Sequence, residues 1–284
     1  MMATERNYRF YISREKAKRS FLGIKSTVTA EDAKVSDLIE MVSLAIEEEV
    51  AVVFYPVTKT KYFDHPDPDN ILKFDEWLIS VDTFTTQNTE VAVTSGQYYL
   101  MQGGSYQGPP YDRIVMKTDS TRPNLLYSGT LQQANALTGK WGWRDEYGAT
   151  GATVLNDPSL AIDGTSLTVL TGKLETHQML LIGDEQVYVS SISAGDPNDT
   201  VTIARAQNGT TAAIHLKDVV VYRQLAPFDI EELCGILTSR LFHRGTTAWA
   251  DRTGTPESGL TYVKAMVAEA VHIVEKYGPP RSYV

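Results

Sequence analysis

The densest group of residues that could bind a metal runs from Asp64 to Asp69, with three carboxylates and an imidazole within six residues. Calcium prefers several oxygen ligands, but an EF-hand loop requires glycine at its sixth position and glutamate at its twelfth. Those two positions hold Asp69 and Asp75 here, and Pro66 and Pro68 stiffen the segment. We therefore interpret it as a solvated turn and predict no metal site.

The remaining candidates for chemistry also have simpler explanations. Asp184 and Glu185 are adjacent, and neighbours on a strand point to opposite faces, so we interpret them as a charge pair beside a turn. Trp141 and Trp143 alternate on an expected strand, which favours core or interface packing over sugar stacking. Cys234 is the single cysteine, which excludes an internal disulfide, and it lies on an apolar helical stripe as a small buried hydrophobe.

No known catalytic motif is present in the sequence. There is no G-x-S-x-G, no Walker lysine loop, no G-x-G-x-x-G and no H-E-x-x-H. The histidines are scattered without a metal-binding spacing: His65, His177, His215, His243 and His272. We predict that the chain has no catalytic, cofactor or metal site and is not an enzyme, although carboxylates distant in sequence can meet in space.

Composition and charge limit the partners. The 284 residues carry a net charge of −9, and the range 151–222 alone has 3 bases and 8 acids, a net −5. No basic stripe is present, which argues against tight binding of phosphates, so a nucleic acid that meets this protein is expected to pass by rather than be held. No apolar run reaches the length that crosses a bilayer, and the first residues lack a signal-peptide core. We expect no membrane partner and synthesis in the cytoplasm.

Amphipathic helices are predicted at both ends of the chain. Ser13 is a plausible cap for a short helix that ends at Gly23, and a longer helix follows from Thr29 to Val53. Another begins at Asp229, and a last one runs through 260–274 before Gly278-Pro279. The acidic run in the second helix favours a solvated face, with a contact between subunits as the alternative. The candidate residues for subunit contacts on these helices are Glu47, Glu48, Glu49, Arg240 and Arg244.

Between the helices, short runs of β-branched and aromatic residues predict strands. In the module over 165–222, Gly183-Asp184 predicts a two-residue hairpin turn, and Val219–Tyr222 is expected to close the sheet. The strands expected there are Met179–Ile182, Gln186–Ser193, Thr200–Ala204 and Val219–Tyr222. The strands expected in the preceding part are Lys59–Phe63, Glu76–Val81, Glu90–Val93, Tyr98–Met101, Arg113–Met116 and Trp141–Trp143.

Two sets of segments resemble proteins of tailed-phage virions. The hairpin IGDEQVYV followed by ARAQNGTTAAIH resembles small β modules that occur in several kinds of phage structural protein. The order of the other segments resembles the head–tail connector, or adaptor, family, whose members form a ring beneath the portal. These segments are KTKYFD, EWLISVDTF, QYYLMQGGSYQGPPYDRIVM and TGKWGW. The module at about 151–222 is absent from minimal members of the family, so the resemblance says least about the role of this module.

The resemblance implies an α+β fold, in which N- and C-terminal amphipathic helices form a platform that carries a central β domain. The inserted module is expected to be a small β-sandwich or barrel. The expected parts are 1–57 (helices), 58–150 (central β domain), 151–222 (inserted module) and 223–284 (helices and tail). Disorder of the end of the chain is the alternative to a tail that docks on the portal. The candidate docking residues are Pro279, Pro280, Arg281, Ser282, Tyr283 and Val284.

The function implied is a structural virion protein of the neck. It would form a homo-oligomeric ring, by resemblance a dodecamer, between the portal and the tail or neck proteins, and DNA would pass through it during ejection. Two alternatives stay open. One is another tail or baseplate attachment protein. The other is a carbohydrate-active or carbohydrate-binding protein that uses the aromatic-rich Tyr98–Tyr111 region and exposed tryptophans such as Trp143.

Overall fold

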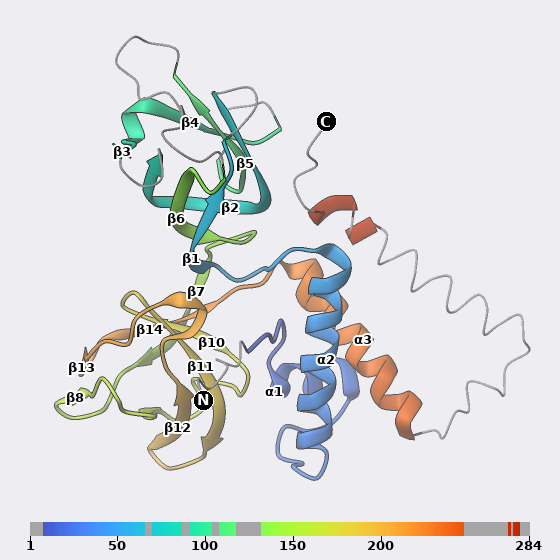
Figure 1. Cartoon of the computed structure of the whole chain (residues 1–284). Helices are drawn as coiled ribbons and strands as arrows, with labels where there is room; N and C mark the ends of the chain where they lie inside the picture. Colours follow the sequence, from blue (N-terminus) through green and yellow to red (C-terminus); the bar gives the residue numbers. More distant parts are fainter. Residues whose placement is uncertain are drawn as a thin grey trace, which may run out of the picture. The chain divides into compact units, whose positions relative to one another are not determined.

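The structure is a computed structural model of the whole chain, and strands dominate it (Figure 1). It describes residues 8–65, 70–86, 91–103, 108–117, 132–246, 272–273 and 275–278, with side chains up to 243 in the last long segment. The chain divides into two compact units. Unit 1 comprises Met1–Val50 and Glu146–Lys276, and unit 2 comprises Ala51–Asp145 and Tyr277–Val284. The chain therefore leaves unit 1, builds unit 2 and returns.

The helices of unit 1 pack around a shared apolar seam. They are α1 (Arg14–Ala17), the π-helix η1 (Lys18–Leu22), α2 (Asp32–Val50) and α3 (Phe228–Thr246). In α2, apolar residues recur every three or four positions and are buried on one face: Val35, Ile39, Val42, Ile46 and Val50. Gly235 of α3 is required by close packing, because a Cβ there would lie 2.5 Å from the Phe21 ring. The predicted stripes before Gly23, after Thr29 and after Asp229 thus correspond to helices, and nearly all of the helix predicted through 260–274 lies outside the described residues.

Six strands of unit 1 form an antiparallel sheet that curls towards closure. Its order is β7 (Tyr147–Thr153), β14 (Val220–Gln224), β10 (Met179–Ile182), β11 (Glu185–Ser193), β12 (Asn198–Ala204) and β9 (Ser166–Leu170). Beyond the end of β7, Leu155 N donates to Thr168 O of β9 at 2.9 Å, so the two outer strands meet. A short pair, β8 (Ser159–Leu160) and β13 (His215–Leu216), lies beside this sheet. The inward side chains form one aliphatic core, which includes Leu167, Val187, Val201 and Val221.

Unit 2 contains a second six-stranded antiparallel sheet. The order is β1 (Val57–Phe63), β6 (Asn135–Trp141), β2 (Ile71–Thr86), β5 (Tyr111–Met116) and β4 (Tyr98–Met101), and β3 (Val91–Ala92) pairs with β2. The 3-10 helix η2 (Ser95–Gln97) precedes β4. Trp141 is buried at the centre of the core, in edge-on contact with Phe74, and its indole Nε1 donates to Lys59 O at 3.1 Å. Unit 2 therefore has a core of its own.

The predicted α+β fold with a helical platform is wrong. The part of the chain that the structure describes is mostly β, 39% strand and 25% helix, with three sheets of antiparallel strands and few helices. The reason is that the apolar stripes show which faces are buried but not what covers them. The buried faces of α2 and α3 pack on each other and on the short N-terminal helices, so the helices that the structure describes form a small cluster and not a layer that carries both β parts.

Several individual elements were predicted correctly. The strands Tyr98–Met101 and Met179–Ile182 are confirmed as β4 and β10, and Gly183 has the positive φ of 60° that the predicted turn needs. The strand expected at Trp141–Trp143 is wrong, because β6 ends at Trp141. Val219–Tyr222 falls largely within β14, but β14 lies between β7 and β10 and does not close the sheet.

The β2–β6 pair leads to a first prediction. A Cβ on Gly139 would lie 2.1 Å from the backbone oxygen of Ser80, and a backbone atom cannot swing away. We expect Gly139→Ala to lower the free energy of unfolding of unit 2 by about 2 kcal/mol, the usual cost of overpacking. Urea unfolding followed by tryptophan fluorescence measures this in a Trp249→Phe background, since Trp77, Trp141 and Trp143 belong to unit 2.

Gly96→Ala is the matched control, because its Cβ would have its nearest neighbour at 4.0 Å. Equal unfolding midpoints for the two variants would contradict the described register between β2 and β6.

Candidate functional site

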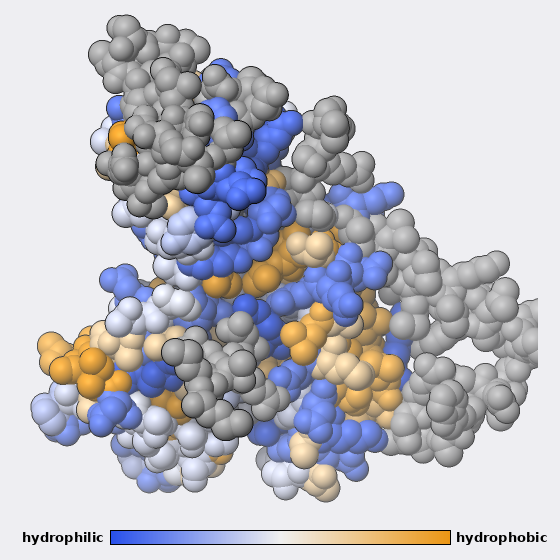
Figure 2. Space-filling model, in the orientation of Figure 1, coloured by the Kyte–Doolittle hydropathy of each residue, from blue (hydrophilic) through white to orange (hydrophobic). Residues whose placement is uncertain are grey.

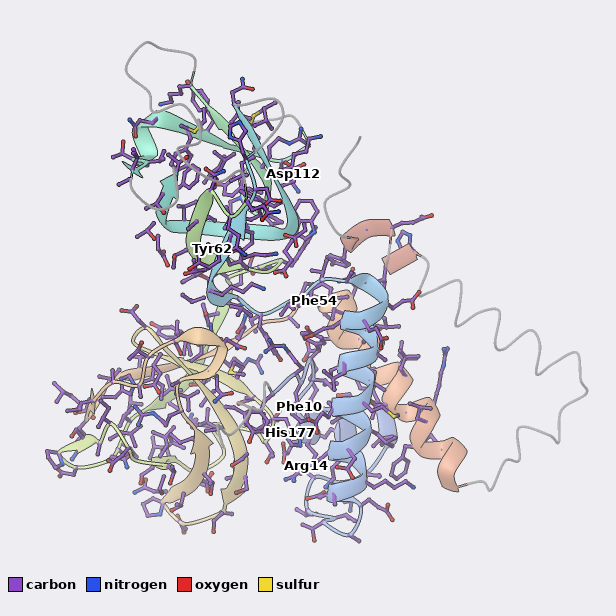
Figure 3. The ribbon with its side chains drawn as sticks, in the orientation of Figure 1. Phe10, Arg14, Phe54, Tyr62, Asp112 and His177 are labelled. Atoms are coloured by element: carbon purple, nitrogen blue, oxygen red, sulfur yellow. The ribbon has the colours of Figure 1, made fainter. Side chains whose placement is uncertain are left out.

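The N-terminal segment from Tyr8 to Ser13 joins the sheet of unit 1 to its helices. The Tyr8 ring stacks on Tyr188 of β11 with centroids 4.0 Å apart, and the Phe10 ring stacks on His177 at 4.1 Å. Figure 3 shows Phe10, His177 and Arg14 gathered at one place beside α2. On its other side, Tyr11 N donates to Ser43 Oγ of α2 at 3.2 Å. Residues more than 150 positions apart are thereby packed together.

His177 lies at the centre of this contact. Its Nε2 is 2.7 Å from Ser36 Oγ of α2, and its Nδ1 is hydrogen-bonded to the Tyr188 hydroxyl. Burial, with the nearby Arg14 charge as a second cause, lowers the pKa of His177 to about 3, and Asp32 opposes this only in part. The imidazole is therefore neutral at pH 7 and acts as a hydrogen-bonding spacer between helix and sheet.

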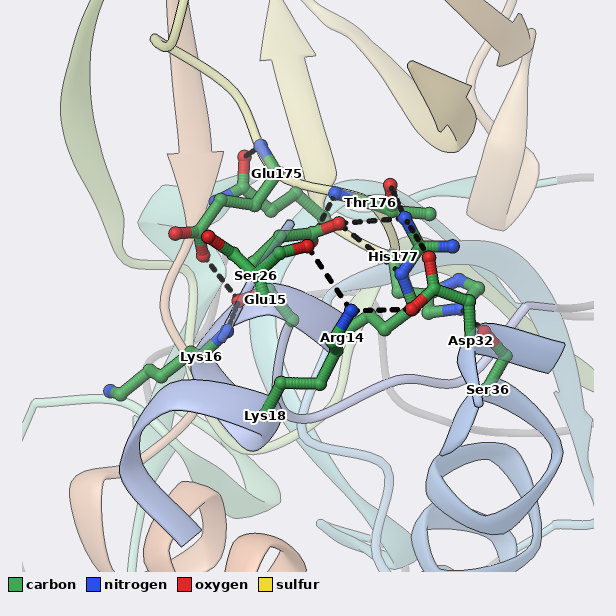
Figure 4. A network of polar contacts seen from close by, with 12 residues as sticks. Arg14, Glu15, Lys16, Lys18, Ser26, Asp32, Ser36, Glu175, Thr176 and His177 are labelled. Carbon is green, nitrogen blue, oxygen red and sulfur yellow. Dashed lines mark hydrogen bonds and ion pairs between the residues drawn. The ribbon is translucent and has the colours of Figure 1, made fainter. Parts of the chain in front are cut away.

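A polar network surrounds the loop from Glu175 to His177 (Figure 4). Ser13 donates to the Glu175 carboxylate, and Thr176 N donates to Glu15 Oε2 at 2.8 Å. Arg14 N donates to Thr176 O at 3.1 Å, while its guanidinium lies 2.8 Å from Glu15. The first turn of α1 thus satisfies the backbone of the loop before β10, which holds the loop against the helices.

Lys18 organises the connection from η1 to α2. Its side chain is buried, and its Nζ donates to three oxygens: the carbonyls of Ser26 and Val28 and Asp32 Oδ1, the last at 2.5 Å. A buried ammonium is stable only when its donors are used, as they are here. The lysine therefore fixes the loop that precedes α2.

The second polar centre is Glu185 at the start of β11, whose side chain is 0% exposed. Arg205 donates to it from Nε and Nη2, both at 2.7 Å. Backbone N–H groups of Ala206 and Ala213 donate at 2.9 and 3.1 Å, and His215 Nε2 lies 2.7 Å away. One carboxylate therefore holds both ends of the 205–215 loop.

These contacts also keep Glu185 ionised. Burial alone would raise the pKa of this carboxyl, but the hydrogen bonds from Arg205, Ala206 N, His215 and Ala213 N outweigh it and hold the pKa below its ordinary value. The interpretation of Glu185 as half of a charge pair beside a turn is wrong, since only Asp184 is exposed. The missed signal was an acidic residue at the start of an aliphatic strand, with an arginine and a histidine in the segment that follows the next strand.

The predicted subunit-contact residues lie in different surroundings. Glu47 is in an ion pair with Arg9 (3.2 Å) and accepts a hydrogen bond from Tyr11, and burial raises its pKa despite both partners. Glu48 and Glu49 are exposed at the end of α2, and Arg240 is half-buried on α3. The side chain of Arg244 and the tail residues Pro279, Pro280, Arg281, Ser282, Tyr283 and Val284 lie outside the described residues.

The other candidates are placed as follows. Trp141 is confirmed as a core residue, and Cys234 is confirmed as buried, with burial raising the pKa of its thiol to about 11. Trp143 lies edge-on to Trp77 and to Tyr277, 5.4 and 4.8 Å between centroids, so its ring packs within unit 2. Asp64 accepts from Gln133 N at 2.9 Å, and 66–69 lie outside the described residues.

Among the described residues, no group of three or more histidine, cysteine, aspartate or glutamate side chains could hold a metal ion. None of the helices described is both long and apolar enough to span a membrane. Comparison with family models, with curated proteins and with solved structures finds no match to this chain.

Glu185 gives the second prediction. Glu185→Gln removes the charge that balances Arg205 and turns an amide towards the donors that surround it, so the buried Arg205 cation loses its partner. We expect the free energy of unfolding of unit 1 to fall by about 3 kcal/mol in urea melts followed by circular dichroism. Asp184→Asn, one residue away and exposed, is expected to change it by less than about 0.5 kcal/mol. Two equally stable variants would refute the role given to Glu185.

His177 gives the third prediction. Its folded-state pKa lies below the ordinary value of 6.5, so between about pH 6.5 and 3 the unfolded chain binds a proton that the folded chain does not. This group therefore lowers the free energy of unfolding as the pH falls, by at most about 1.4 kcal/mol per pH unit. Urea melts at pH 7 and pH 5.5 measure the slope above the range where Glu185 titrates.

His177→Asn is expected to flatten that slope, because asparagine tolerates the left-handed backbone (φ 70°) at this position and does not titrate. His272→Asn, at an exposed histidine, should leave the slope unchanged. If both variants keep the wild-type slope, the buried neutral imidazole does not govern acid sensitivity.

Proposed function

We propose that this chain is a structural virion protein, a head–tail adaptor that forms a ring between the portal and the tail and lets DNA pass. The identity of the assembly rests on the resemblance of the segments over 59–143 and of the 182–215 module to phage connector and virion proteins. The proposal that the chain is a structural protein, with no chemistry of its own, rests on the geometry of unit 1.

The observation that carries this part of the proposal is how unit 1 uses its buried ionisable groups. Glu185 accepts from four partners, Lys18 donates to three oxygens and His177 joins Ser36 to Tyr188. Each of these groups is engaged with other parts of the same unit and fixes a loop. Buried charge that fixes the shape of loops is what a subunit needs if it must present rigid surfaces to several neighbours.

A ring follows when a contact between two different surfaces of neighbouring copies closes on itself. The acidic balance of the chain, −9 overall, is suited to a channel through which DNA slides, because like charge prevents the phosphates from binding. Unit 2 keeps Trp143 packed against Tyr277, and this packing does not favour the carbohydrate-binding alternative.

The fourth prediction tests the adaptor directly. The mass of the purified chain is measured by light scattering on a size-exclusion column, alone and after mixing with the portal protein from the same genome. We expect either a ring-sized species, or a monomer that co-elutes with the portal after mixing. The same column run with tail and baseplate proteins from that genome provides the comparison.

A monomer that ignores the portal but binds a tail or baseplate protein would overturn the adaptor and support the other virion role. A monomer that binds none of them and is retained on a glycan array, with loss of retention in Trp143→Ala, would overturn the structural proposal altogether.

A further inference from the structure

The β8–β13 pair of unit 1 exposes an aliphatic patch, which we call the tip: Ile162, Ile214 and Leu216. Their exposed fractions are 54%, 61% and 65%. Figure 2 shows hydrophobic atoms gathered over this pair of strands. Ile214 and Leu216 flank the buried His215, so on an extended chain both project from the face opposite to it.

Hydrogen bonds from one buried arginine side chain hold the backbone of the tip in place. Arg205 Nη1 donates to Ala161 O and Gly164 O, at 2.7 and 3.1 Å, in the loop that carries Ile162. Arg205 Nη2 donates to Ala213 O, next to Ile214. The same guanidinium is bound to buried Glu185. Both loops that display the aliphatic side chains are therefore fastened to one arginine, so little conformational entropy remains to be lost when a partner binds.

The rim of the tip is acidic. Asp157, Asp163 and Asp218 are exposed beside the tip residues, and Lys217 lies among them, 3.3 Å from Asp157. An apolar centre with a charged rim is the usual anatomy of a protein–protein contact. The excess of carboxylates disfavours nucleic acid and anionic lipid, and it also disfavours a second copy of a chain that is itself acidic.

We propose that the tip is a docking surface for a different protein, one that offers an apolar pocket bordered by lysine and arginine side chains. The inference rests on the proposed function, in which the chain has other proteins as neighbours in a particle, and it deepens that function by naming the surface and the chemistry of the partner. The aliphatic side chains would fill the pocket, and Asp157, Asp163 and Asp218 would select the basic rim.

The fifth prediction uses a photo-reactive residue, benzoylphenylalanine, placed at Leu216 of the tip or at Leu170. Leu170 is an equally apolar residue on β9, 45% exposed, and serves as the matched control. Cells that produce the particle are irradiated, the particles are purified, and the cross-linked peptides are identified by mass spectrometry. We expect position 216 to cross-link to another protein at a peptide rich in lysine and arginine, with at least tenfold more product than position 170.

A second measurement tests the charge. In purified particles, the yield of cross-linked product from position 216 should fall several-fold when Ile214→Asp is added. The yield from position 216 should also fall when Asp163→Lys and Asp218→Lys are added together. Cross-linking of position 216 to another copy of the chain, equal yields at 216 and 170, or yields unaffected by both changes would overturn the inference. Absence of the chain from purified particles would overturn the proposed function instead. The products cross-linked in the cells would then test the docking surface by the same criteria.

Discussion

The buried carboxylate of Glu185 is the interaction on which the rest of unit 1 depends. A charge without access to water is costly unless it is fully hydrogen-bonded, so the 205–215 loop must fold back to bring its donors, Arg205 and the backbone N–H groups of Ala206 and Ala213. Once Arg205 is fixed, its remaining N–H groups hold the carbonyls of Ala161 and Gly164. A single acidic residue therefore determines the path of two loops and the surface that they present.

A second constraint comes from the order of the chain. Unit 1 is assembled from residues before and after unit 2, so its two pieces must find each other across a long stretch of sequence. The contacts that join them are aromatic and specific: Tyr8 on Tyr188, and Phe10 on His177, which in turn meets Ser36 of α2. Neutral His177 is suited to this position because a charged ring would not tolerate the burial and the neighbouring Arg14.

Local patterns were enough to predict many elements. Alternation and turn chemistry gave β10, the turn at Gly183 and β11, and the spacing of apolar residues gave α2 and α3. The packing of these elements against one another was not predictable in the same way. A pattern of apolar residues shows which face of a helix or strand is buried, but it does not show which other element packs on that face. The helical platform failed for this reason. Glu185 was misread because the partners that make its burial possible lie 20 to 30 residues away, and only the folded loop shows that they meet.

Buried charged groups such as Glu185 and Lys18 fix loops of unit 1, and we propose that the chain functions by assembling with other proteins. The most direct test is the number of copies of this chain in purified particles, measured by quantitative mass spectrometry with isotope-labelled peptides and compared with the portal. We predict that each particle contains a fixed number of copies of the chain, close to that of one dodecamer. Particles that are complete and infectious without it, or that contain it only in trace and variable amounts, would contradict the proposed place in the neck.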